Sequence, residues 1–345
     1  MKKNNRPTIR EIAQLVGVSI NTVSRALNDK PDVSQETRKK VVEIARELNY
    51  TPNAIAQALV QRSTRTIGVI LSDISDPFFG EMVKDAEEFF RTQGYSLILC
   101  NTQENYRQEK HSIEILINKR VDGILMTPVQ KDDENILEIT GSGIPVVLLG
   151  RHFDRLPVPS VTSNDEQGGY LATRHLIELG HRRILFMNVS PRISSARERL
   201  KGYQRALEEA GMDYDGSLLL RSSFDWDDAY QKSKDYFTHQ KETTAVIVFC
   251  DILAVNVMKA IMDIGLRVPR QVSLVGFDNI KIGSLLPNPL TTIDPNKKEM
   301  VKTASRLLLR SIQDGINEDR HLSIEPKLII RLSTAPPISA KGGNQ

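Results

Sequence analysis

The chain has few of the residues that cross-link a fold through disulfides or bind metals: two cysteines and six histidines among 345 residues. Cys100 and Cys250 stand alone in β-rich runs, so both are predicted to be small core residues rather than partners in a disulfide. The histidines are scattered without the spacing of metal ligands. We therefore expect neither a disulfide framework nor a bound metal.

Motifs of catalysis are missing as well. The sequence contains no P-loop, no GxSxG and no HExxH, and the segment GSGIPV at 141–146 does not match GxGxxG. No group of residues combines a nucleophile, a base and a charge-stabilising partner. We therefore expect a protein that is not an enzyme, with no catalytic residues and no cofactor.

Long apolar runs are also absent. No segment approaches the roughly 20 apolar residues that span a bilayer, and no signal-peptide core follows the polar, basic stretch Met1 to Arg6. The expectation is a cytoplasmic protein without a membrane partner. The polar C-terminal segment SAKGGNQ carries no heptad repeat, which argues against a C-terminal coiled coil.

Charge is distributed unevenly along the chain. Residues 1–65 hold 12 Lys and Arg against 6 Asp and Glu, whereas the other 280 residues hold 34 against 37. The basic excess therefore lies at the N-terminal end, as expected where one end of a protein meets phosphates. Basic surfaces without that role are common, so the charge supports a nucleic-acid partner without deciding it. The length allows two or three domains.

The segment TIREIAQLVGVSINTVSRALN, residues 8–28, predicts two short helices joined by a tight turn. Thr8 can cap the first helix, whose apolar residues recur at helical spacing: Ile9, Ile12, Ala13 and Val16. Gly17 ends this helix. Ser19 caps the next one, which directs Val23 and Leu27 inward. This spacing is typical of a helix-turn-helix.

The outward face of the second helix carries residue types that read DNA bases. Arg25 can pair with guanine O6 and N7, Asn21 can bond a base edge, and Ile20 can contact a thymine methyl. Thr22 and Asn28 are predicted to contact phosphates. An ordinary helical hairpin is the alternative interpretation, which the residue types on this face disfavour.

A third helix follows. Ser34 is predicted to cap it, and it ends near Asn49 after contributing apolar residues to a small common core: Val41, Ile44, Ala45 and Leu48. Pro52 and Asn53 then restart a helix of only about two turns within YTPNAIAQAL. A helix of that length is marginal in water by itself.

From Thr66 onward, short β-rich runs alternate with longer helical runs. Strands are predicted at 67–71, 96–100, 123–126, 145–149, 183–187, 245–249 and 272–276. Three of the intervening helical segments end at a glycine, a frequent helix terminus: 78–94, 165–180 and 252–265. This alternation predicts βαβ architecture, in which ligands gather at the carboxyl ends of the strands.

Four motifs in order, VSINTVSRALN, VSQETRKKV, ELNYTPNAIAQAL and TIGVILSDISDPFF, resemble the LacI/GalR family of bacterial transcription regulators. The likeness continues through SLVGFDN to the strand near Ser333 and covers nearly the whole chain. It implies an α/β fold class: an N-terminal three-helix helix-turn-helix headpiece with a hinge helix, then a periplasmic-binding-protein-like body of two Rossmann-like subdomains. By itself, the body resembles a periplasmic sugar-binding protein equally well.

The resemblance also implies domain boundaries. The headpiece would span 1–60, with the hinge helix at about 52–60, and the effector-binding and dimerisation domain would span 61–340. Within the body, three crossovers would join subdomain one, about 66–162 plus 293–323, to subdomain two, about 163–292 plus 324–340. A homodimer of this kind would bind double-stranded DNA at a pseudo-palindromic operator.

Leu59 lies where the family inserts a leucine between the central base pairs of the minor groove, which kinks the duplex. The alternative is a linker residue that packs on the body. With the hinge included, the residues predicted to bind DNA are Thr8, Ser19, Ile20, Asn21, Thr22, Arg25, Asn28, Asn53, Ala56 and Leu59.

The resemblance implies an effector between the subdomains. Phe78 and Phe79, after Asp76, match a loop whose aromatic rings face the ligand, although Phe79 is equally well explained as core. Arg199 and Asp278 match the family's ligand-binding arginine and acid, with a turn residue as the alternative for Asp278. The expected effector-binding residues are Asp76, Phe78, Phe79, Arg151, Ser195, Arg199, Phe224 or after a small shift Trp226, Cys250 and Asp278.

Two positions depart from the family pattern. Gly150 replaces the acid that often precedes Arg151, and Cys250 replaces an asparagine common in sugar-binding relatives. Both changes remove acceptors, so the arginines are predicted to be poorly compensated and the effector to carry a carboxylate or phosphate. The competing interpretation is that Asp76 and Asp278 neutralise the arginines and that a neutral sugar binds.

The sequence therefore predicts a DNA-binding transcriptional regulator, specifically a repressor of carbohydrate-uptake or catabolic genes. A small sugar or sugar-derived effector would control it by changing the orientation of the two body subdomains. The alternative is a stand-alone solute-binding protein of the sugar-binding type.

Overall fold

The computed structural model describes residues 7–51, 63–240, 242–315 and 321–338. They form two separate units that divide after Thr64. Each unit has a hydrophobic core of its own, as expected for independently packed domains. Among the described residues, no helix has the length and apolar character needed to cross a membrane.

The first unit is a three-helix headpiece. Its helices are α1 (Ile9–Val16), α2 (Ile20–Leu27) and α3 (Gln35–Glu47). One apolar cluster joins them, and its buried members are Ile12, Ala13, Val23, Ala26, Val33, Val41 and Ala45. A core this small holds three helices because each of them turns one apolar stripe inward.

Local signals in the sequence fix where these helices begin and end. Thr8 caps α1 in a reciprocal capping box with Glu11, and the Ser19 hydroxyl accepts from the Thr22 backbone N–H. Gly17 adopts a φ of 74°, a left-handed conformation that lets the chain turn sharply between α1 and α2. The predicted caps and turn are confirmed.

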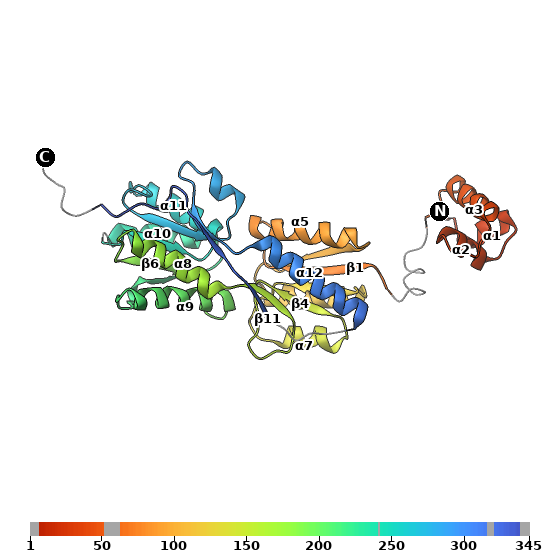
Figure 1. Cartoon of the computed structure of the whole chain (residues 1–345), viewed down its shortest axis with the longest axis horizontal. Coiled ribbons are helices and arrows are strands. Elements are labelled where there is room, and N and C mark those ends of the chain that lie inside the picture. Colours follow the sequence, from red (N-terminus) through yellow and green to blue (C-terminus); the bar gives the residue numbers. More distant parts are fainter. Residues whose placement is uncertain (1–6, 52–62, 241, 316–320, 339–345) are drawn as a thin grey trace. The chain divides into compact units, whose positions relative to one another are not determined.

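The second unit, the body, contains two six-stranded sheets (Figure 1). The first sheet has the order β11-β5-β4-β3-β1-β2 and is parallel throughout. Its strands are β1 (Thr66–Leu71), β2 (Ser96–Asn101), β3 (Gly123–Met126), β4 (Val146–Leu149), β5 (Ser160–Ser163) and β11 (His321–Ile324). We call this sheet and its helices the first lobe.

Helices cover both faces of the first sheet. One face packs against α5 (Pro77–Thr92) and α12 (Lys297–Asp314), and the other against α6 (Tyr106–Asn118) and α7 (Glu134–Gly141). Successive strand residues point to opposite faces, so Val69 joins the first cluster and Ile70 the second. Strands buried on both faces read as continuous apolar runs, which explains the clear signal of β1, β3 and β4.

The second lobe repeats this plan. Its sheet has the order β12-β10-β9-β8-β6-β7, with only the β12–β10 pair antiparallel. The strands are β6 (Ile184–Asn188), β7 (Leu219–Arg221), β8 (Ala245–Val248), β9 (Ser273–Phe277), β10 (Thr291–Asp294) and β12 (Lys327–Ile329). Short 3₁₀ turns lie at Gly216–Leu218 and Lys281–Leu285.

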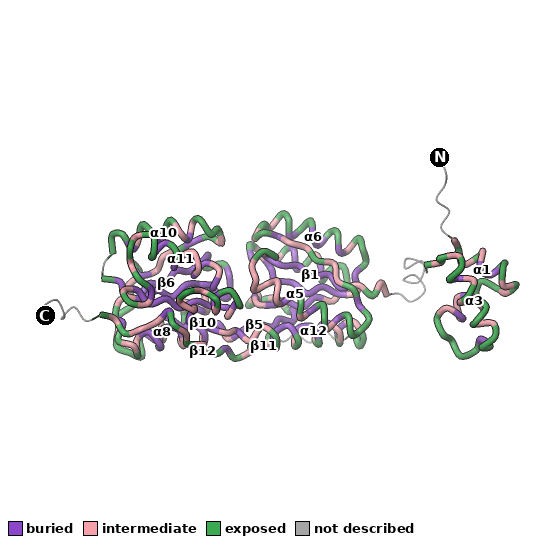
Figure 2. The backbone as a smooth tube through the Cα atoms, turned by 90° about the horizontal axis from the view of Figure 1, so that it is seen from above, coloured by how far each residue is buried: buried purple, intermediate pink, exposed green. Residues whose placement is uncertain are grey.

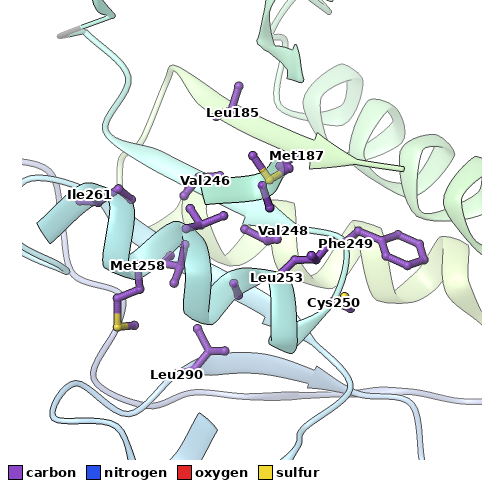
Figure 3. Close-up of a cluster of buried hydrophobic side chains, with 14 of the residues drawn as sticks. Leu185, Met187, Val246, Val248, Phe249, Cys250, Leu253, Met258, Ile261 and Leu290 are labelled. Atoms are coloured by element: carbon purple, nitrogen blue, oxygen red, sulfur yellow. The ribbon is translucent and has the colours of Figure 1, made fainter. Parts of the chain in front are cut away.

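Four helices flank the second sheet. Helices α8 (Asp165–Glu178) and α9 (Ser194–Glu209) cover one face, while α10 (Trp226–His239) and α11 (Asp251–Asp263) cover the other. Figure 3 shows the apolar side chains between the sheet and α11, with Phe249 and Cys250 at the end of the cluster where β8 stops. Both lobes have the same layering, with buried strands (purple in Figure 2) inside and the exposed sides of the helices (green) outside.

Glycines let α8 and α9 approach closely. A Cβ on Gly169 would collide with the Arg199 carbonyl, and a Cβ on Gly202 would collide with the Glu166 carbonyl. This contact brings the N-terminal half of α9 against α8 and fixes where Arg199 projects. Tight helix packing is therefore the role of Gly169 and Gly202.

The chain crosses between the lobes three times: between Ser163 and Asp165, between Asp294 and Lys297, and between Ile324 and Lys327. Ile293 and Asp294 therefore belong to the second lobe, although the predicted boundary assigns them to the first subdomain, and Ser163 and Ile324 belong to the first lobe rather than the second. Each crossing follows the last residue of a strand, because a strand completes its ladder before the chain leaves the sheet.

Candidate functional sites

The outward face of α2 is available to a partner. Ile20 is 43% exposed and Asn21 is exposed, while Val23 beneath them is fully buried. Thr22 shares a 2.8 Å hydrogen bond with the Ser19 hydroxyl. A helix that buries one side and presents an amide, a hydroxyl and an apolar tip on the other has the form of a recognition helix.

Arg25 on this face is not alone. Its Nε donates to the Asp32 carboxylate at 2.6 Å, and both side chains are substantially exposed. This ion pair raises the pKa of Arg25 and lowers that of Asp32. Sequence reasoning missed Asp32, which lies in the turn before α3. Asn28 caps the end of α2, and its Nδ2 donates to the Ser24 carbonyl at 2.8 Å.

Three of the residues predicted to bind DNA, Asn53, Ala56 and Leu59, lie outside the described part of the chain. The hinge helix and the wedge role of Leu59 therefore stay predictions.

A cavity lies between the lobes, where the strands of both sheets end. All ten residues predicted to bind the effector line it. The first lobe contributes the N-terminus of α5 and the loop after β4. The second lobe contributes the start of α9, the start of α10, the start of α11 and the loop after β9. The tertiary structure thus brings together segments more than 200 residues apart, and their contact with an effector stays a prediction.

Arg151 is bound tightly by its own lobe. Its terminal nitrogens donate to the Glu104 carboxylate at 2.6 and 3.0 Å, and one also donates to the Pro128 carbonyl at 2.8 Å. Glu104 also accepts from the Ser72 hydroxyl. The sequence analysis did not select Glu104, although it follows a predicted strand at the edge where ligand-facing groups gather.

Arg199 is held in the same way. Its Nε donates to Asp165 at 2.7 Å, and Nη1 donates to the Phe249 carbonyl. The guanidinium carbon lies 3.4 Å from the ring centroid of Phe277 and 4.4 Å from that of Phe249. Both charges are nearly buried, and Nη2 donates to no described residue. Asp165 follows β5, a strand too polar to stand out in the sequence.

These two ion pairs correct the expected electrostatics. Arg151 and Arg199 were predicted to be poorly compensated, with Asp76 and Asp278 as their only candidate counter-charges. Instead Glu104 and Asp165 neutralise them, because loops distant in sequence meet at the cavity. The remaining ionisable groups on the lining are all acids: Asp73, Asp76 and Asp278.

Burial changes the chemistry of two of these acids. It raises the pKa of Asp76 to about 6. The Phe78 backbone N–H donates a hydrogen bond to the Asp76 carboxylate and so opposes this shift. Burial raises the pKa of Asp278 well above its usual range, with Arg199 opposing. No described residue donates a hydrogen bond to the Asp278 carboxylate, so its acceptors are open to a ligand.

Aromatic rings form the apolar part of the lining. Phe78 and Phe79 meet edge to face at 5.1 Å, and Phe224 meets Phe249 at 5.8 Å in the same manner. Phe79 also packs against the core of the first lobe, so it serves both interpretations given for it. Phe224 and Trp226 both reach the cavity, and Trp226 is 44% exposed.

The two cysteines differ in burial. Cys250 is buried and precedes α11 at the cavity, whereas Cys100 on β2 is only partly buried. His181 follows α8 and is buried, and its ring nitrogens are hydrogen-bonded to Thr244, Ser273 and the Ala335 carbonyl. Across the described residues, no cluster of His, Cys, Asp and Glu has the arrangement of a metal site.

Two family profiles match the chain. Residues 8–53 match "Bacterial regulatory proteins, lacI family", and residues 64–332 match "Periplasmic binding proteins and sugar binding domain of LacI family". The chain belongs to the LacI family of transcriptional regulators. It is a DNA-binding transcriptional repressor with a body of the effector-binding kind, and the family is not one of enzymes, which confirms the expectation of no catalysis.

Relatives and solved structures agree with this assignment. The HTH-type transcriptional repressor PurR of Photobacterium profundum is 34% identical over 328 residues, covering 94% of this chain and 98% of the relative. The lac repressor dimer bound to operator and the anti-inducer ONPF matches with a TM-score of 0.85 at 27% identity, covering 96% of this chain and 100% of that one. A CelR–cellobiose complex matches with a TM-score of 0.72 at 29% identity, covering 95% and 100%.

The resemblance and the two-part fold inferred from the sequence are thereby confirmed. The alternative of a stand-alone solute-binding protein is wrong, since the LacI profile matches at the N-terminus and the described residues there form a helix-turn-helix.

Proposed function

We propose that this repressor, in the family of LacI regulators, binds as a homodimer to a pseudo-palindromic operator and responds to a neutral, hydroxyl-rich sugar held between its lobes. The observation that carries the effector class is the charge of the cavity lining. Glu104 and Asp165 form ion pairs with the two arginines of the lining, and the other ionisable groups of the lining are carboxyl groups. Carboxyl groups, whether ionised or protonated, accept hydrogen bonds from hydroxyls, and they offer an anion no positive charge.

The shape of the lining supports a sugar further. Phe78 and Phe224 offer apolar ring faces, against which the C–H face of a pyranose or furanose can lie. Asp278 supplies open acceptors, and Nη2 of Arg199 supplies a donor beside them. The CelR relative in complex with cellobiose is one family member of the same fold with a sugar ligand.

A planar nitrogen base is the second candidate, because the same two rings could hold it by stacking. Its ring nitrogens carry both donors and acceptors, so it would depend less on the carboxylates than a sugar does. Substitution of an acid separates the two candidates.

Calorimetric titration of the full chain tests the effector class. The panel pairs D-ribose with ribose 5-phosphate, and D-glucose with gluconate and glucose 6-phosphate, and adds cellobiose and the purine base hypoxanthine. We expect the neutral sugars to bind more tightly than their anionic partners. Asp278→Asn should weaken sugar binding by about tenfold or more, since one of the two carboxyl oxygens that accept from hydroxyls is lost.

Asp213→Asn, a change at an exposed loop, is the matched control and should leave binding unchanged. Tighter binding of the phosphate or carboxylate members would overturn the neutral-sugar proposal. Binding of hypoxanthine alone, insensitive to Asp278→Asn, would favour the planar base.

DNA binding is tested with the region upstream of the chain's own gene. We expect a specific gel shift, a footprint of two half-sites and a 2:1 ratio of chain to operator. A monomeric footprint would contradict the homodimer. A cytoplasmic location follows from binding to the bacterial chromosome and stands with this proposal.

A further inference from the structure

Lys297 joins the two walls of the cavity. It is the first residue of α12 in the first lobe, and its side chain is only 11% exposed. Its Nζ donates to the Asp278 carbonyl at 2.5 Å and to the Asn279 carbonyl at 3.2 Å, both in the second lobe. The same Nζ pairs with the Glu81 carboxylate on α5 at 3.0 Å. We infer that Lys297 is a positioning residue that couples the acid-bearing loop of the second lobe to α5 of the first lobe.

The place of Lys297 in its helix argues that these contacts have a purpose of their own. A cation in the first turn of a helix opposes the positive end of the helix dipole, so this position normally favours an acid or a cap. Asn296, the residue before it, makes no side-chain cap for α12. The helix therefore gains nothing locally from Lys297, whereas two of its contacts join the lobes and the third joins α12 to α5.

The loop at one end of this bridge needs external support. Asp278 has a φ of 112° and Asn279 a φ of 49°, which are unfavourable for residues with a side chain. The Ile280 N–H donates to Asp251 at 2.9 Å, which holds the far side of the loop. Lys297 donates to the Asp278 and Asn279 carbonyls, and so fixes the backbone from which the Asp278 carboxylate enters the cavity.

The other end of the bridge is α5. Glu81 lies on this helix one turn after Phe78, and Asp76 caps the helix beside the cavity. Because a capped helix moves as a rigid element, a displacement of Glu81 also displaces Phe78 and Asp76. Lys297 therefore ties the rings and cap of the first lobe to the acid of the second. The inference rests on the proposed effector cavity, but its test requires no effector.

Lys297 also sets the charge balance of this region. It lowers the pKa of three neighbouring buried acids, Asp76, Asp251 and Asp278, all of which burial raises. The other charged groups here are Glu81, Asp294 and Arg331, the last two bonded to Asn279, and Arg199 across the cavity. Removing Lys297 leaves an excess of buried acid, which favours separation of the walls.

Hydrogen exchange on the full chain without added ligand tests the coupling. The amides of Asn279 and Ile280 report on the loop, and that of Phe78 reports on α5, since all three are hydrogen-bonded. Lys297→Met should speed exchange at both places by roughly tenfold, the loss expected for charge-assisted bonds. Lys302→Met is the matched control on α12, because that lysine pairs only with Glu299 of its own helix at an exposed site.

The decisive variant is Glu81→Gln, which does not touch the loop. If Lys297 couples the two lobes, Glu81→Gln alone speeds amide exchange at Asn279 and Ile280. Added to Lys297→Met, the same substitution has no further effect on exchange at these two amides. Lys297→Arg, which keeps the charge, should restore most of the protection. Unchanged exchange at the loop in Glu81→Gln, or an equal effect in both backgrounds, would overturn the inference. If Lys297→Met fails to fold, the Glu81→Gln and Lys297→Arg variants decide by the same loop amides.

Discussion

The headpiece and the body each contain an arginine that pairs through Nε with an aspartate. In the headpiece, Arg25 lies 2.6 Å from Asp32, and in the body Arg199 lies 2.7 Å from Asp165. The geometry is nearly the same, but the surroundings differ. The headpiece side chains are 43% and 52% exposed, whereas those of the body are 8% and 3% exposed, with two aromatic rings over the guanidinium.

This difference separates two uses of one chemical pair. Water and salt screen the exposed pair, so Arg25 can leave Asp32 at little cost, as its predicted contact with a base edge requires. The buried pair cannot open without leaving a charge in a medium that solvates it poorly. Arg25 is therefore suited to a reversible contact, and Arg199 to a fixed wall of a cavity.

The largest expected effect comes from breaking the buried pair. Arg199→Met leaves Asp165 buried without its counter-charge and should lower the free energy of unfolding of the body by about 3 to 5 kcal/mol. Urea unfolding of the full chain measures this loss. Arg205→Met is the matched control on α9, because its partner Glu166 is more exposed, and it should cost under about 1 kcal/mol. Equal losses in the two variants would contradict the distinction drawn here.

The next effect concerns DNA. Arg25→Ala should weaken binding to the cognate operator by about tenfold or more and relax preference at one base position, because the predicted bidentate contact to guanine would be lost. Gel shifts on a set of single-base operator variants measure the change. An equal loss on random DNA would assign Arg25 to phosphate instead.

A smaller effect should appear with pH, at Glu198 beside Arg199. Burial and the charge of Asp165 raise the pKa of Glu198 to about 7 from an ordinary 4.5. Between these values the folded chain holds more protons than the unfolded chain, so this contribution to stability is present below pH 4.5 and lost as pH rises through 7. Glu198→Gln cannot ionise, so its free energy of unfolding relative to that of wild type should increase by about 1 kcal/mol as the pH rises from 5 to 8.

Unfolding at several pH values measures this gain, with Glu208→Gln, an exposed acid on the same helix, as the control. A constant difference between Glu198→Gln and wild type across the range would refute the assignment.

The smallest effect is expected for Asp32→Ala. The unfolding midpoint of the headpiece should not move, since an exposed pair contributes little. Random-DNA binding should tighten because an acid near the phosphates is gone, while the ratio of operator to random-DNA affinity should fall roughly threefold as Arg25 loses its support. Glu36→Ala, which breaks the exposed pair with Lys40 on α3, is the control and should leave this ratio unchanged. A ratio unchanged in Asp32→Ala as well would show that Arg25 needs no support.

Much of the fold could be predicted because its signals are local. Caps such as Thr8 and Ser19, the turn at Gly17 and apolar strands such as β1 depend on residues within a few positions of each other. Short strands with polar or edge character, such as β5, β7 and β11, gave no such signal. Their backbone pairs because neighbouring strands are already in place, which no local pattern encodes.

For the cavity, the sequence by itself determined which residue types stand at the ends of the strands. Through family resemblance, it also indicated ten of the residues that line the cavity. Only the tertiary structure decided which opposite charges meet, because Glu104 meets Arg151, Asp165 meets Arg199, and Lys297 meets Glu81 across large separations in the chain. Electrostatic energy depends on distance and burial in space, and neither quantity can be read from the order of residues along a chain.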